Sequence, residues 1–302
     1  DEGGAMKHVG LLVLGSFINS LGTGLSAFGL AVVILRVYGT ASSVAAVQMS
    51  AFAPIVLLAP LAGALADRYD RRLMMIIGDA GSILGLGIIL AALSSPRPSL
   101  AWVCAGAVIS SCLAALTEPA LRASVTDLVT EEDYVRSSGL LQLASAAKYL
   151  LAPAAAGFLM PLVGVRGLLL LDASTCLVTV GCTMTVRRAL AAGASRRAAP
   201  QPGDDHDVLA GWRTITTSPG LRTLVVLMTL ATLAIGVIQV LIKPILLPTV
   251  STAEMGVVET VAAAGMLVGA ALVTAWKSAQ PTTLLAAGLA GTGVAMVPVP
   301  LA

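Results

Sequence analysis

Charged residues gather at one point of an otherwise apolar chain. Only 11% of the 302 residues are charged, yet the segment from Asp67 to Arg72 reads DRYDRR. Apolar runs flank this segment directly, PIVLLAPLAGALA before it and LMMIIG after it. Neighbouring Asp and Arg side chains form ion pairs, Arg side chains bind lipid phosphate, and basic residues hold a loop on one side of a membrane.

Single ionisable residues also lie inside the apolar stretches, where a charge costs a few kcal/mol, so each is a candidate for an ion pair or a transport role. We interpret Asp79 and Asp172 as structural charges and place Glu118 on a substrate or ion pathway. Polar residues on the first apolar stretch, Asn19 and Thr23, could donate hydrogen bonds to a substrate or serve in helix packing.

Three further intramembrane charges leave alternatives open. Lys243 and Glu259 are expected at similar depth on adjacent helices, as a structural salt bridge or as part of a transport path shared with Gln239. Lys148 is expected near the membrane midplane, with no acid of segment 167–186 at its depth. It either faces a central cavity, where it binds an anionic group or moves a proton, or it pairs with an acid at position 79 or 118.

Composition fixes the fold class that must position these side chains. The chain is 57% hydrophobic with mean hydropathy +0.92, well beyond the range of soluble proteins. Apolar runs of about 20 residues, long enough to span a bilayer as helices, recur along it. We therefore expect an all-α polytopic membrane protein. The predicted spans are 11–35, 44–66, 73–94, 101–121, 138–162, 167–186, 223–247, 255–276 and 283–302.

The polar segments between the spans predict orientation and domains. Basic residues concentrate in the segments that share a side with the N-terminus, whereas the opposite segments hold only Arg36, Arg97 and Arg166. The positive-inside rule then predicts an inner (cytoplasmic) membrane protein with its N-terminus inside. Residues 1–186 are expected to form a six-helix bundle and 223–302 a partial second bundle of about three helices. The order of six spans, a linker and three spans predicts a six-plus-six transporter without its last three spans.

Residues 187–222 form the only long polar stretch of the chain, rich in Ala, Arg, Pro, Gly and Asp, and are interpreted as the linker between the bundles. Within this stretch Val208, Trp212 and Ile215 recur at helical spacing. They predict a short amphipathic helix at the inner membrane surface.

The charged segment at the second-to-third span junction carries a pattern that resembles motif A of the major facilitator superfamily. The matching residues are Gly63, Leu65, Asp67, Arg68, Arg71 and Arg72. Asp70 replaces the usual glycine, as in the macrolide-efflux and siderophore-exporter-like branch. Further stretches that resemble this branch are PALRASVTDLVTEEDYVRSSGLLQ, LAPAAAGFL, LLLLDASTCLV and GWRTITTSPGLRTL.

This resemblance implies alternating access between two bundles and makes the motif A segment a conformational latch. Asp67 would dock near the eleventh span, for which this chain has no counterpart, and the three arginines would be its charge partners. Pro153 and Gly157 match the antiporter motif C in part, and the Arg of motif B is absent from the fourth span. The implied function is efflux of an amphipathic small molecule such as a drug, macrolide or siderophore, and the departures from motifs B and C weaken the case for exchange with protons. The rival hypothesis is a truncated, non-transporting fragment or membrane scaffold.

Other chemistry finds little support in the sequence. The two histidines, His8 and His206, lie outside the predicted spans, and the four cysteines have no metal-site spacing. No phosphate-binding loop, nucleophile–base pair or nucleic-acid signature is present, so we expect neither an enzyme nor a cofactor. The expected partners are the lipid bilayer, a small-molecule substrate and protons.

Overall fold

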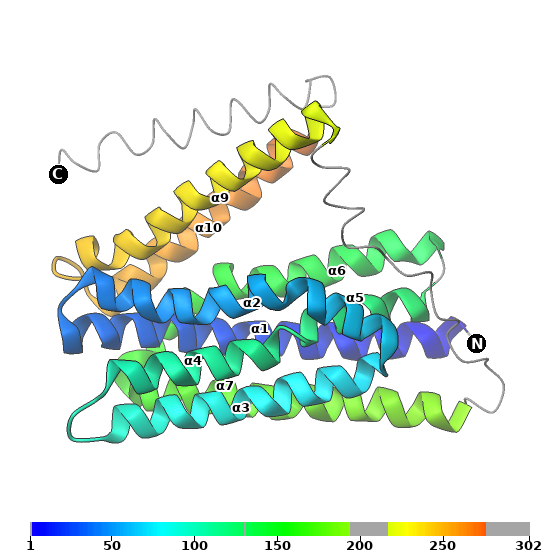
Figure 1. The fold of residues 1–302 in the computed structure, drawn as a ribbon, viewed down its shortest axis with the longest axis horizontal. Coiled ribbons are helices and arrows are strands. Elements are labelled where there is room, and N and C mark those ends of the chain that lie inside the picture. Colours follow the sequence, from blue (N-terminus) through cyan, green and yellow to red (C-terminus); the bar gives the residue numbers. More distant parts are fainter. Residues whose placement is uncertain (1, 130, 194–216, 276–302) are drawn as a thin grey trace.

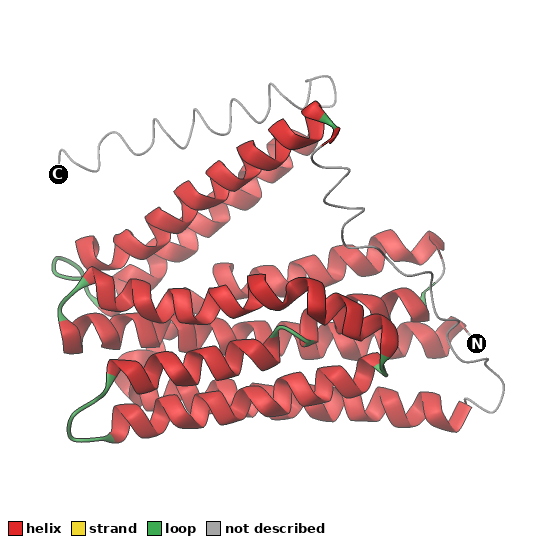
Figure 2. Cartoon of the chain, viewed as in Figure 1, coloured by secondary structure: helices red, strands yellow, loops and turns green. Residues whose placement is uncertain are grey.

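The computed structural model describes residues 2–129, 131–193 and 217–275, and in this part of the chain every regular element is a helix (Figure 2). The expectation of an all-α membrane protein is confirmed. Among the described residues, five helical segments are long and apolar enough to cross a bilayer, namely Met6–Tyr38, Ala41–Ala66, Arg71–Ser94, Leu100–Leu128 and Ala152–Leu190. The helices are α1 (Glu2–Tyr38), α2 (Ala41–Arg68), α3 (Arg71–Ser94), α4 (Leu100–Ala114), α5 (Thr117–Leu128), α6 (Glu131–Leu150), α7 (Ala152–Gly193), α9 (Pro219–Leu246) and α10 (Thr252–Ala275).

Helices α1 to α7 lie side by side as one bundle, which we call the N-terminal bundle (Figure 1). Helices α9 and α10 form a pair that meets this bundle at one end and diverges from it towards the other. We call the end that carries Arg71 and Arg187 the basic end, and the opposite end, where α9 turns into α10, the far end. The expected ninth span, 283–302, and the amphipathic segment around Trp212 lie outside the described residues.

Two glycines reverse the chain at the far end with almost no loop. Gly39 joins α1 to α2 with φ of 68°, and Gly164 interrupts α7 with φ of 66° and ψ of 179°. Only glycine adopts such angles readily, because it lacks a Cβ atom. The first part of α7 therefore continues the direction of α6, and its second part returns to the basic end and extends to Gly193, beyond the expected limit of 186.

Two predicted spans are broken rather than continuous. The span expected at 101–121 divides into α4 and α5, with a turn at residues 115–116. Pro119 accounts for this break, because its ring displaces the carbonyl of Ala115 and it has no N–H to bond there. The span expected at 138–162 breaks at Leu151, where Pro153 has the same effect.

The buried side chains form three clusters. One joins α1, α2, α3, α4 and α7 towards the far end around Ile34 and Val103. A second joins α1, α2, α3, α5, α6 and α7 towards the basic end around Leu12 and Met75. The third unites Phe28 and Val32 of α1 with Met255 of α10, so an apolar core continues from the N-terminal bundle into the second helix pair.

Close packing between α3 and α4 depends on the glycine at position 85. A Cβ atom there would lie 2.5 Å from the carbonyl oxygen of Gly106 and from Ser110. A Cβ atom on Gly87 of the same helix would meet no described atom within 4 Å.

We therefore expect Gly85→Ala to lower the free energy of unfolding by about 1–3 kcal/mol, as overpacking does. Gly87→Ala is the matched control and should be neutral or stabilising by about 0.5–1 kcal/mol, because it only improves helix propensity. Thermal or denaturant unfolding of both variants in detergent measures this difference. Equal stabilities would contradict the packing role of Gly85.

Candidate functional site

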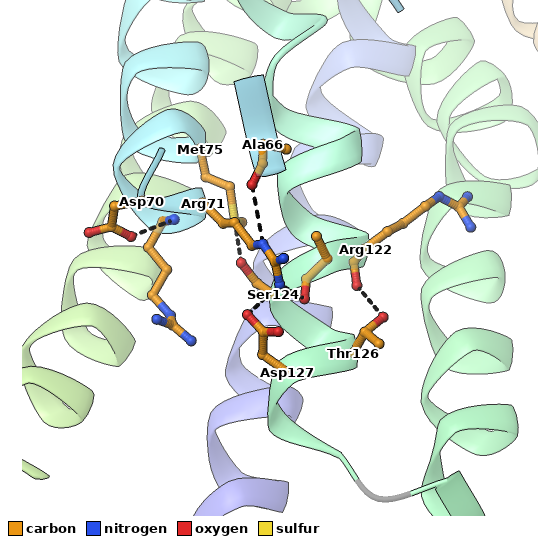
Figure 3. A network of polar contacts seen from close by, with 10 residues as sticks. Ala66, Asp70, Arg71, Met75, Arg122, Ser124, Thr126 and Asp127 are labelled. Carbon is orange, nitrogen blue, oxygen red and sulfur yellow. Dashed lines mark hydrogen bonds and ion pairs between the residues drawn. The ribbon is translucent and has the colours of Figure 1, made fainter. Parts of the chain in front are cut away.

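The guanidinium of Arg71 ties three helices together at the basic end. Figure 3 shows it between the end of α2 and the end of α5. Its Nε donates to the carbonyl of Ala66 at 3.2 Å and its Nη1 donates to the carbonyl of Ala123 at 3.0 Å. Nη1 also lies 2.5 Å from Oδ2 of Asp127. The carbonyl of Ala66 lies in the last turn of α2, where backbone acceptors lack helical partners.

Asp70 links the same segment to α7. It is the N-cap of α3, where its Oδ1 accepts the backbone N–H of Arg72 at 3.0 Å. Its Oδ2 accepts the Nε–H of Arg187 at 2.9 Å, across 117 residues of sequence. The aspartate that replaces the motif A glycine therefore both starts α3 and pairs with the end of α7.

The remaining motif A residues behave differently from one another. Arg68 is exposed, and Leu65 packs against the cluster at the basic end. A Cβ atom on Gly63 would meet nothing within 4 Å among the described residues, so this glycine makes no close helix contact in this conformation. The Nε of Arg72 is buried without a hydrogen-bond partner in the described part of the chain. The side chain of Asp67 lies outside the described residues, so its latch role stays a prediction.

Replacing Arg71 should separate the basic ends of α2 and α5. We expect Arg71→Ala to cost about 2 kcal/mol, because it leaves two partly buried carbonyls and a carboxylate without their charged donor. Arg68→Ala removes an exposed arginine from the same segment and should stay within about 0.5 kcal/mol of the wild type. Unfolding in detergent compares the two, and a loss of equal size in both variants would contradict the assigned contacts.

The Asp70–Arg187 pair predicts a pH dependence of stability. Burial alone would raise the pKa of Asp70, but the hydrogen bonds from Arg187 and from the Arg72 N–H outweigh it and hold this pKa below its usual 3.8. A depressed carboxyl pKa stabilises the fold fully above the unfolded-state value, and this contribution is lost as the pH falls through the folded-state value.

We therefore expect Asp70→Asn to melt below the wild type at neutral pH, with the gap closing as the pH falls below about 4. Melting curves of both proteins across that range test this expectation. A gap of constant size down to pH 3 would show that the charge of Asp70 contributes nothing.

Buried polar groups line the contact between α1 and α7 within the membrane-spanning region. Asp172, only 4% exposed, accepts a short hydrogen bond from the Ser26 hydroxyl. The Cys176 thiol donates to Oδ1 of Asn19 at 3.5 Å, and Thr23 is a further neighbour of the Asp172 carboxyl. Asn19 and Thr23 thus contact α7, a placement that matches the packing alternative for both, and their substrate role stays a prediction.

The two acidic candidates nearer the basic end have separate partners. Asp79, 2% exposed, accepts a hydrogen bond from Thr117 at 3.1 Å, next to the break between α4 and α5. Its other carboxyl oxygen has no partner among the described residues. Glu118 pairs with Arg122 one turn along α5 at 2.7 Å, and both side chains are more than half exposed.

The N-terminal bundle meets α10 through backbone rather than through long side chains. A Cβ atom on Gly157 would lie 2.6 Å from the carbonyl oxygen of Thr252, and one on Gly256 would collide with the carbonyl oxygen of Pro153. The break at Leu151 frees the N–H of Ala154, which donates to the Thr260 hydroxyl at 3.2 Å. The residues that match motif C therefore lie directly in this contact.

Two lysines flank this contact. Lys243 of α9 is 7% exposed, forms a short ion pair with Glu259 of α10 and lies 5.4 Å from the centre of the Phe28 ring. The geometry is that of the expected salt bridge, and Gln239 one turn earlier is exposed. The Nζ of Lys148 lies 6.0 Å from the ring centre of Phe52 and 5.6 Å from that of Tyr149.

Lys148 departs from two expectations. It forms no ion pair with Asp79 or Glu118, which have the partners described above. Contrary to the depth argument, an acid of the sixth span lies at similar depth, because Asp172 packs against Gly22 of α1 and the Lys148 backbone packs against Gly24. No carboxylate oxygen of the described residues lies within 4.0 Å of the lysine, however.

Comparison with known proteins decides the family. The sequence matches the Major Facilitator Superfamily over residues 12–302. The chain belongs to this superfamily. Among solved structures it resembles one described as "Crystal structure of auto inhibited POT family peptide transporter", with 15% sequence identity and a TM-score of 0.49. That match covers 91% of this chain and 55% of the other, so the chain spans about half the length of that transporter. No curated protein matches the sequence.

Sequence reasoning about this superfamily member missed several residues that the fold brings to the site. Asp127 and Arg187 pair with the motif A segment from 56 and 117 positions away, and no local pattern marks such partners. Thr260 and Gly256 are ordinary membrane-helix residues by sequence. A signal did exist at Ser251 and Glu254, whose Ser-x-x-Glu spacing forms a reciprocal capping box at the start of α10.

Proposed function

We propose that this protein is a secondary active transporter that exports amphipathic small molecules by alternating access, with protons as the exchanged ion. The observation that carries the proposal is the contact of α7 with α10. Helices α9 and α10 meet the N-terminal bundle at the far end and diverge from it towards the basic end (Figure 1). Bundles that touch at one end only fit the rocking motion by which such proteins expose a central site.

The α7–α10 contact combines close backbone approach with one polar link and an apolar cluster. Gly157, Gly256 and the backbone of Pro153 let the two helices approach closely. The polar link from Ala154 to Thr260 is a single neutral hydrogen bond, which typically contributes about 1 kcal/mol net. The buried cluster around Phe28 and Met255 adds apolar contact and stabilises this conformation.

Charge supports an orientation in the cytoplasmic membrane. The basic residues at positions 68, 71, 72, 122, 136, 187 and 188 lie towards the basic end, as expected for the cytoplasmic side. With the N-terminus inside, the far end is the outer side and the described conformation is closed towards the outside. The resemblance of DRYDRR and its flanking stretches to the efflux branch supports export over uptake.

A bulkier residue at the α7–α10 contact should impair transport. We expect Gly256→Ala to reduce turnover at least about tenfold, because the new Cβ atom meets the Pro153 backbone and disfavours the outward-closed state. Gly265→Ala, on the same helix with open space around it, should keep turnover within about twofold. The measurement is dye accumulation in inside-out vesicles containing the full-length protein, with ethidium, rhodamine 123 and carboxyfluorescein as probes.

Two outcomes would count against the proposal. Equal turnover in the two glycine variants would remove the α7–α10 contact from the transport cycle. If the wild type folds and inserts but moves none of the probes under a proton gradient, a non-transporting membrane scaffold becomes the better description.

A further inference from the structure

Of the two lysines within the membrane-spanning helices that the structure describes, Lys148 has no carboxylate oxygen within 4.0 Å. The other, Lys243, pairs with Glu259. The Nζ of Lys148 instead lies near two aromatic rings, Phe52 on α2 and Tyr149 on its own helix. Both rings are nearly half exposed, and the lysine is itself partly exposed.

The position of these three side chains points towards the second helix pair rather than towards lipid. Helix α2 contacts α9 and helix α6 contacts α10, with α1 between them. The lysine reaches from α6 to a ring on α2, so it crosses the side of α1 that faces α9 and α10. Gly24 of α1 packs on the Lys148 backbone. Phe28 lies one turn further along α1, and its ring contacts Lys243 of α9.

The depth of Lys148 places it just inside the closed end. It precedes Pro153 by five residues, which is about 7.5 Å along a helix. From there towards the basic end, α9 and α10 diverge from the N-terminal bundle (Figure 1). Lys148 thus lies on the basic-end side of the α7–α10 contact, the side from which the proposed transporter would be loaded.

The described surroundings of Lys148 offer its ammonium group two aromatic faces and no close carboxylate. Aromatic faces attract an ammonium ion by cation–π interaction and leave N–H donors free for another acceptor. Asp172 packs near Gly22 of α1, and its carboxylate oxygens lie more than 4.0 Å from the ammonium group. A cation with free donors attracts an anion.

We infer that Lys148, Phe52 and Tyr149 form a binding site for an organic anion, in which the ammonium group holds a carboxylate or sulfonate and the two rings contact an adjoining apolar or aromatic body. This inference rests on the proposed transport function and narrows its substrates to amphipathic anions. The site is independent of the motif A segment, which lies at the basic end.

The charge preference of the site is measurable without a known substrate. In a background where the four native cysteines are replaced by alanine, Phe52→Cys places a reporter thiol beside Lys148. The probes are the anionic 2-sulfonatoethyl and the cationic 2-trimethylammonioethyl methanethiosulfonates. The ratio of their labelling rates cancels any change in thiol reactivity. We expect the anion-to-cation ratio to fall about tenfold in Lys148→Met and to persist in Lys148→Arg.

Binding of a matched ligand pair completes the test on the otherwise unmodified full-length protein. The carboxylate 2-naphthoate and the amine 2-naphthylmethylammonium share one ring system and differ in charge. We expect only the carboxylate to raise the melting temperature saturably, and this shift to disappear in Lys148→Met.

An unchanged labelling ratio in Lys148→Met, a reporter that neither reagent reaches, or equal shifts by the two naphthalene ligands would overturn the site. None of these measurements requires turnover. If the protein keeps the charge preference at Lys148 but does not transport, only the proposed transport function is contradicted. If it transports but shows no charge preference, only the anion site is contradicted.

Discussion

The contact between α7 and α10 is the constraint on which the arrangement of this protein depends. Pro153 breaks the helix, the break frees the N–H of Ala154, and that group finds its acceptor on Thr260 of the other helix group. Glycines at 157 and 256 remove the side chains that would hold the two backbones apart. The helix break in the N-terminal bundle therefore lies at the contact between the two helix groups. The apolar cluster around Met255 packs at the same contact.

Charges in this molecule serve two separate purposes. At the basic end, Arg71 and Asp70 bind helix ends and neighbouring helices, so they fix the geometry of one rigid bundle. Within the membrane-spanning region the charges are fewer and more deeply placed, and their partners come from adjacent helices. Because charges are costly there, the lysine of α6, which has no carboxylate oxygen within 4.0 Å among the described residues, carries functional information.

The sequence alone predicted the fold class, most helix positions and the Lys243–Glu259 pair, because apolar run length and residue depth determine them. It did not predict the break before Pro119, since membrane helices often tolerate proline and only tertiary partners decide where backbone groups are freed. It expected Arg71 to pair with acids of its own segment. The fold supplies Asp127 instead, because helix ends distant in sequence meet at the basic end.

The chain reversals at Gly39 and Gly164 have a consequence for how the protein can be recognised. In the described residues the far end exposes only two short connections, residues 95–99 and 247–251, because the other two reversals occur at or beside a single glycine. An antibody or other binder approaching from that side would find helix tips and few flexible epitopes.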